Sequence, residues 1–250
     1  MTSKQITRLF YGLLAFGSFS FADTITQKVD FGSDGIFDQF DCSKGILNFI
    51  RLDLTLNIYG GQINYDNDSA SEAIGTLLFG AAVDIKDTSD VSLLDSSYQL
   101  IFDNGNVYAF TSFDFILAPD NGDGKNNYDE SAPDGAIAIG TDKTVSDSGF
   151  IASSFWSQGN KGFLGTGKFV IPYSLISLTE FSGENVTEIE YSCTPPVWTD
   201  GSLTLTYDYN PIPEPGGLCL MAAGVFTSFI RKKYERLLGG NTSFGYEIPD

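Results

Sequence analysis

The sequence predicts an all-β protein, an antiparallel β-sandwich or jelly-roll-like single domain, from three observations. Apolar and polar residues alternate with period two in several segments, as they do in strands with one buried face. Clusters of Gly, Asn, Asp and Ser separate these segments, as turns do. Residues 23–210 contain no internal repeat and no second domain boundary, so we expect one β domain over that range.

The clearest alternation lies in residues 49–59, where every second residue is Ile or Leu and the residues between are mostly polar. Residues 203–209 repeat the pattern with Leu and Tyr on one face. Both segments are predicted to be half-buried antiparallel strands. Further strands are predicted at residues 24–31, 74–85, 98–102, 107–117 and 163–171, and a hairpin turn at residues 103–106.

The N-terminal stretch has the composition of a signal peptide. Lys4 and Arg8 provide a positive region, an uncharged apolar run follows, and a small-x-small pattern ends at Ala22. The alternative is a first buried helix, which the glycines and serines of this run disfavour. We expect residues 1–22 to be a signal peptide cleaved between Ala22 and Asp23, and the protein to be exported through the inner membrane.

Residues 211–236 combine a proline-rich entry, a short apolar helix and a basic cluster. The prolines favour an extended backbone. At ~1.5 Å per residue, a helix over residues 216–230 reaches only ~22 Å, short of a ~30 Å hydrocarbon core. Basic residues after the helix are expected on the cytoplasmic side. The residues that define the pattern are Pro213, Glu214, Pro215, Arg231, Lys232 and Lys233.

This arrangement resembles the PEP-CTERM sorting tag of bacterial surface proteins. The resemblance implies cleavage by an exosortase-type enzyme at or near Pro-Glu-Pro, after transient or permanent membrane insertion of the helix. The alternatives are an ordinary C-terminal membrane anchor and an amphipathic helix lying on a domain; the apolar residues on all sides of the helix disfavour the second. The sequence departs from the tag pattern in one respect, because a polar extension, residues 237–250, follows the basic cluster.

A second resemblance covers most of residues 24–209. The Phe-Asp pair of residues 37–41, the Lys-Gly-Ile-Leu opening of residues 44–56, residues 163–167 and residues 203–209 are similar to the "choice-of-anchor E" domain. That family implies an exported, anchored β domain without an assigned catalytic activity. It supplies no active-site residues to carry over.

Composition excludes several classes of function. The chain has a formal net charge of −18 and the acidic excess lies between residues 23 and 213, so it repels nucleic acid and anionic lipid headgroups. Such a surface can hold divalent cations or simply keep a protein soluble, and solubility is the default interpretation. Histidine is absent, which excludes Ser-His-Asp triads, Cys-His pairs and His-based zinc sites.

Cys42 and Cys193 are the two cysteines of the predicted β domain. In an exported protein they are candidates for one disulfide, with two free buried thiols as the alternative. No basic cluster accompanies either residue, so neither is expected to be a nucleophile.

Residues 119–130 are the strongest candidate for a metal site. Aligned on an EF-hand-type calcium loop, the ligands are Asn121, Asp123, Asn127 and Glu130, although Pro119 stands where an Asp is required. The alternative is a solvated acidic loop between strands. Residues 65–68 form a second acidic loop with a weaker case for Ca²⁺.

The leading functional hypothesis is a non-catalytic protein of the cell surface or of the extracellular polysaccharide matrix. Two alternatives stay open: a carbohydrate-active enzyme, a glycoside hydrolase or lyase with a carboxylate pair, and a calcium-dependent adhesin. Exposed aromatic rings stack on sugars, so Phe155, Trp156 and Trp198 are candidates for carbohydrate contacts, with core packing as the alternative for each.

Overall fold

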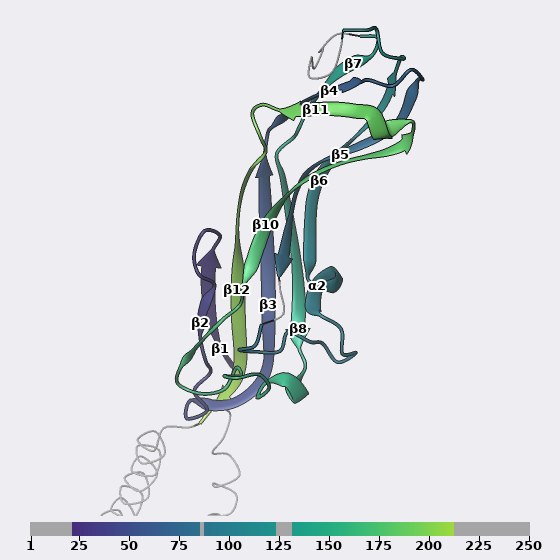
Figure 1. The fold of residues 1–250 in the computed structure, drawn as a ribbon. Coiled ribbons are helices and arrows are strands. Elements are labelled where there is room, and N and C mark those ends of the chain that lie inside the picture. The colour runs from purple at the N-terminus through teal and green to yellow at the C-terminus, as the bar shows by residue number, and fades with distance from the viewer. Residues whose placement is uncertain (1–21, 86–87, 124–131, 213–250) are drawn as a thin grey trace, which may run out of the picture. The chain divides into compact units, whose positions relative to one another are not determined.

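The computed structural model describes residues 22–85, 88–123 and 132–212. Within them, Asp23–Tyr209 form one compact unit. The regular secondary structure of this unit is almost entirely strands in antiparallel sheets, as predicted (Figure 1).

The largest sheet has four strands in the order β1-β12-β3-β8. They are β1 (Asp23–Asp30), β12 (Trp198–Pro211), β3 (Gly45–Tyr59) and β8 (Lys143–Ile151). β1 pairs with β12 and β3 pairs with β8, both antiparallel. The predicted alternation of residues 49–59 is confirmed, because the apolar face of β3 is at most 1% exposed, at Ile50, Leu52, Leu54, Leu56 and Ile58.

A second sheet has the order β10-β5-β6 and consists of long strands. They are β10 (Tyr173–Glu184), β5 (Ala73–Ile85) and β6 (Asn106–Leu117). A third sheet, β11-β4-β7, contains β11 (Ile189–Cys193), β4 (Gln62–Asn67) and β7 (Gly135–Ile139).

Short elements complete the fold. β2 (Ile36–Asp38) pairs with β9 (Lys168–Val170). Two 3₁₀ turns, η1 (Ser153–Phe155) and η2 (Val186–Glu188), connect strands. The segment α2 (Ile101–Asn104) is a turn rather than a regular helix, because Phe102 has φ 64° and ψ −167°.

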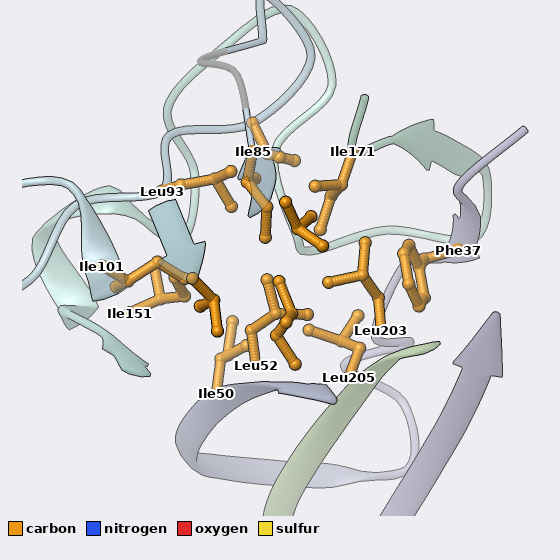
Figure 2. Close-up of a cluster of buried hydrophobic side chains, with 14 of the residues drawn as sticks. Phe37, Ile50, Leu52, Ile85, Leu93, Ile101, Ile151, Ile171, Leu203 and Leu205 are labelled. Carbon is orange, nitrogen blue, oxygen red and sulfur yellow. The ribbon is translucent and has the colours of Figure 1, made fainter. Parts of the chain in front are cut away.

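Two hydrophobic clusters hold the sheets together. The main core lies between the four-stranded sheet and the Ala81–Ile85 half of β5, and Figure 2 shows its Leu and Ile side chains pointing toward one another. The distal core joins the β11-β4-β7 sheet to the opposite half of β5 and β6 (Figure 1). Its buried members are Ile63, Tyr65, Ala73, Leu77, Phe79, Phe115, Leu117 and Ala138.

β5 runs through both cores, and Gly80 lies at the boundary. Residues up to Phe79 belong to the distal core, and Ala81 begins the main core. A Cβ at Gly80 would lie 2.1 Å from the carbonyl oxygen of Ala109 on β6. Glycine therefore allows the two strands to approach closely where the cores meet.

The structure corrects three predicted elements. Residues 98–102 are not a strand, because Leu100 and Ile101 turn to pack on the main core, and Leu100 makes only an isolated bridge to Leu94. Of residues 163–171, only β9 is a strand, since Gly165 takes a positive φ of 146°. The second acidic loop is largely a strand, because residues 65–67 belong to β4.

The other predicted strands are confirmed within two residues at most of their boundaries, except that β3 begins at Gly45, before residue 49, and β12 begins at Trp198, before residue 203. The expected turn at residues 103–106 is present, with a bridge between Asp103 and Asn106. β6, which follows it, pairs with β5 rather than with residues 98–102.

Candidate functional site

Most residues of the predicted signals lie outside the described part of the chain. Ala22 is exposed, and Asp23 begins β1. The predicted sorting residues Pro213, Glu214, Pro215, Arg231, Lys232 and Lys233 lie outside the described residues, as do the proposed calcium ligands Asn127 and Glu130.

The structure brings together the two acidic segments that the sequence presents separately. The backbone N–H of Asn67, at the end of β4, donates to the carbonyl oxygen of Asp134 at 3.1 Å. The N–H of Asp120 donates to the carbonyl oxygen of Ser69 at 2.9 Å. We call the resulting group of four carboxylates, from Asp66, Asp68, Asp123 and Asp134, the acidic junction.

The side chain of Asn67 fixes the backbone of the acidic junction. Its side chain is fully buried, and its Nδ2 donates to the carbonyl oxygens of Ser71 at 2.9 Å and Ala118 at 2.7 Å. Its Oδ1 accepts from the N–H of Ser69 at 3.1 Å. One side chain thus links the end of β4 to the end of β6, where the acidic loop begins.

Asn121 and Asp134 form a second fixed contact. The N–H and Nδ2 of Asn121 donate to the two carboxylate oxygens of Asp134 at 2.7 and 3.1 Å. The Oδ1 of Asn121 accepts from the N–H of Asp123 at 3.0 Å. Asn121 therefore orders the loop and orients Asp134, which is fully buried.

Asp66 is the most unusual residue of the acidic junction. Its side chain lies on the face of β4 opposite Tyr65, is only 3% exposed, and its Oδ1 has no hydrogen-bond partner. Burial and the nearby carboxylate of Asp123, with smaller contributions from Asp134 and Asp68, raise the pKa of Asp66 to about 6.

The sheet register places a glycine on one side of this carboxylate and an acidic residue on the other. On β7 the residue opposite Asp66 is Gly135, which has no side chain, and on β11 it is Glu190. In residues 22–85, 88–123 and 132–212, no group of three or more His, Cys, Asp or Glu side chains is arranged to hold a metal ion. A cation bound there needs other oxygen donors to complete its coordination shell.

A separate hollow of about 480 Å³ lies between residues 95–102 and β8. Its lining combines two aromatic rings with two carboxylates and two hydroxyl groups. These residues are Phe102, Phe150, Asp95, Asp147, Ser96 and Ser148. Tyr98, which is 71% exposed, lies between lining residues in the sequence.

Close packing forms one wall of the hollow. A Cβ at Gly149 would lie 2.5 Å from the Cβ of Ile101, so glycine allows residues 101–104 to rest on β8. Asp95 orders the neighbouring turn, because its Oδ1 accepts from the N–H groups of Ser97 and Gln99 at 2.7 and 3.1 Å. The periodicity of the sequence does not predict this hollow, because its two sides come from segments that do not pair as strands.

The three aromatic candidates fall into two classes. Phe155 is 4% exposed in the main core, and the indole Nε1 of the partly buried Trp156 donates to the carbonyl oxygen of Ile151 at 3.0 Å. Both are packing residues. Trp198, at the start of β12, is 74% exposed and is available for a ligand.

Cys42 and Cys193 are free thiols in this structure, so the candidate disulfide is not formed. Cys42 is exposed, and Cys193 is half-buried at the end of β11. Burial raises the pKa of the Cys193 thiol, which keeps it protonated and unreactive at neutral pH.

Comparisons with known proteins do not identify a family. No family model matches the chain, and no curated protein matches it. Structures of infectious bursal disease virus, the Gx strain and the VP2 subviral particle, align over 86% of this chain at 14% and 13% identity. Their TM-scores are 0.13 and 0.10, and the chain spans about half the length of these proteins. Among the described residues, no helix has the length and apolar character needed to cross a membrane.

Proposed function

We propose that this protein is an exported, non-catalytic β-domain protein of the bacterial cell surface, associated with the extracellular polysaccharide matrix. The N-terminal signal directs export in this proposal, and the C-terminal tag anchors or releases the domain through an exosortase-type enzyme. Its resemblance to PEP-CTERM and choice-of-anchor E sequences supports this delivery route.

The hollow beside β8 is the observation that carries the matrix-binding part of the proposal. Aromatic faces such as Phe102 and Phe150 stack on the apolar faces of sugar rings. The neighbouring Ser148 hydroxyl and Asp147 carboxylate offer hydrogen bonds to sugar hydroxyls. The net charge of −18 favours neutral polysaccharides over polyuronates, because like charges repel.

Affinity electrophoresis of the purified protein tests this binding. We expect retardation in gels that contain extracellular polysaccharide of the native host, and in some gels that contain a neutral glucan or xylan. Phe150→Ala should abolish the retardation, because it removes a ring that is 54% exposed at the hollow. The matched control is Tyr108→Ala, which removes a ring that is 43% exposed on β6. Equal retardation of both variants would contradict binding at the hollow.

Delivery is tested separately by cell fractionation. We expect wild-type protein in the surface or extracellular fraction of a host with an exosortase. Replacing Glu214 and the flanking Pro213 and Pro215 by Ala should leave an uncleaved, membrane-associated form. Normal release of that variant would contradict the proposal that these residues are a sorting tag. A second variant that lacks residues 237–250 tests whether the polar extension slows processing.

A carbohydrate-active enzyme is the second candidate, because two carboxylates, Asp95 and Asp147, line the same hollow. Hydrolysis by a carboxylate pair requires one acid and one base or nucleophile across the scissile bond. The hydrogen bonds of Asp95 to its own turn favour a structural role. Release of new reducing ends by wild type but not by Asp147→Asn would establish the enzyme and replace the non-catalytic proposal.

A further inference from the structure

We propose that the acidic junction binds one hard divalent cation, Ca²⁺, through the carboxylates of Asp66 and Asp123. This inference is independent of the proposed function, because it requires neither export nor a polysaccharide. It assigns the central role to Asp66, which lies on β4, outside the EF-hand-like alignment of residues 119–130.

The buried oxygen of Asp66 is the first argument. Oδ1 has no hydrogen-bond partner although the side chain is only 3% exposed. A buried acceptor without a partner is unfavourable, and more so when it carries negative charge. The nearby carboxylates of Asp123, Asp134 and Asp68 further disfavour its ionised form, so a cation at this position would stabilise it.

The scaffold around Asp66 is the second argument. Two backbone hydrogen bonds, from Asn67 to Asp134 and from Asp120 to Ser69, fix the loop that carries Asp123 beside β4. The contact between Asn121 and Asp134 holds a further buried carboxylate nearby. The acidic segments are thus held together by hydrogen bonds from neutral donors, which is the preorganisation that a cation site needs.

The identity of the cation follows from the donor set. All the nearby ligands are oxygen atoms, which hard cations prefer. Fewer than three acidic side chains are arranged for one ion among the described residues, so backbone carbonyl oxygens and water have to complete the shell. Ca²⁺ accepts such mixed, irregular shells of six to eight oxygens, whereas Mg²⁺ requires near-octahedral geometry.

Thermal unfolding of the purified full-length protein in CaCl₂, MgCl₂ or chelator at equal ionic strength tests the proposal. Extracellular calcium modules bind at ~10⁻⁴–10⁻³ M, so ~5 mM CaCl₂ is sufficient. We expect Ca²⁺ to raise the melting temperature of wild type and Mg²⁺ to raise it less. Isothermal titration should give one Ca²⁺ per chain.

The Asp66→Asn variant distinguishes between two roles of Asp66, a ligand of a cation and an acid that only binds a proton. The substitution keeps the size of the side chain and removes its charge. In chelator at neutral pH it should melt at a higher temperature than wild type, because repulsion is relieved. In CaCl₂ it should gain little, with Ca²⁺ affinity lower by at least about tenfold. The matched control Asp30→Asn, on an exposed part of β1, should keep the full calcium response.

The outcomes decide the proposal. A calcium response in wild type that Asp66→Asn loses and Asp30→Asn keeps would support it. Identical melting of wild type in Ca²⁺ and in chelator, with a more stable Asp66→Asn, would overturn it and leave Asp66 as a proton site only. A calcium response that Asp66→Asn retains would place the ion elsewhere and would equally overturn it.

Discussion

The two cores of this protein are built from different chemistry, although β5 and β6 contribute to both. The main core is almost wholly apolar, with Leu and Ile from β3 and β12 at its centre (Figure 2). The distal core is smaller and rich in rings: Tyr65 contacts Phe115 and Phe181, with ring centroids 5.7 and 5.5 Å apart. Beside it lie three of the buried polar side chains, those of Asp66, Asn67 and Asp134.

This difference indicates different roles for the two ends. Apolar burial stabilises a fold without placing any particular chemical group, whereas buried carboxylates reduce stability unless a partner compensates them. The main core, which is the larger of the two, is therefore the greater source of stability. At the distal end, buried carboxylates lower the stability of the fold, and such groups are typical of functional sites.

The largest expected effect is in the main core. Leu54→Ala removes a fully buried side chain from the middle of β3 and should reduce the free energy of unfolding by ~3–5 kcal/mol. Denaturant unfolding followed by tryptophan fluorescence measures it. Ile46→Ala on the same strand is the control: its side chain is 71% exposed, so a loss of less than ~0.5 kcal/mol is expected. Comparable losses would remove the distinction between buried and exposed faces of β3.

Asn67→Ala should have the next largest effect, because it removes three hydrogen bonds, two within the turn after β4 and one to Ala118 at the end of β6. Leaving buried carbonyl oxygens without donors should cost ~2–3 kcal/mol. Denaturant unfolding again provides the measurement, with Asn160→Ala in an exposed loop as the control. A loss no greater than that of the control would show that the acidic junction is held by other contacts.

The acidic junction should also give the protein an unusual pH dependence in the absence of divalent cations. The pKa of Asp66 is about 6 in the folded protein and near 4 in the unfolded chain, so the folded state binds the proton more tightly. This contribution is fully present below pH ~4 and is lost as the pH rises through ~6. Relative to Asp66→Asn, wild type should lose on the order of 2 kcal/mol over that interval.

Chemical denaturation at pH 4.5, 5.5 and ~7 in chelator measures the difference between the two proteins. The main core holds no such group, so Leu54→Ala should change stability by a constant amount at every pH. A pH-independent difference between wild type and Asp66→Asn would show that Asp66 is not a buried acid of raised pKa.

The smallest expected effect on stability is that of Trp198→Ala. The ring is 74% exposed, so the free energy of unfolding should change by less than ~0.5 kcal/mol. Thermal melting checks this value. A large loss would mean that Trp198 packs on the domain, and a small loss with weaker polysaccharide binding would extend the ligand surface to the start of β12.

The sequence predicted the two regions unequally. Alternation places Ile50 to Ile58 on one face of β3 because the period of a strand is a local property, and the long strands β5 and β6 follow from the same reasoning. In the sequence, residues of the acidic junction lie in two separate predicted loops. These residues come together only because β4 pairs with β7, and the spacing of residues in a sequence does not encode the register between distant strands. Asp66 was assigned to a predicted loop.

Two further strands were missed for a related reason. β10 and β8 have mixed, largely exposed faces, so their hydrophobic periods are weak. Residues 98–102 have strand-like composition, yet tertiary packing of Leu100 and Ile101 prevails over local propensity. The hollow that follows from this packing could not be predicted from any single segment.

The position of β12 has a mechanical consequence. It lies inside the four-stranded sheet, between β1 and β3, and its last residues are opposite the first residues of β1, with Tyr209 facing Asp23. A pull on the chain after β12, resisted at the distal end, acts along the strand axes and loads the hydrogen bonds of both neighbouring ladders in shear. Many bonds then have to break together rather than one after another. This arrangement suits a domain that is tethered at its C-terminus and exposed to drag.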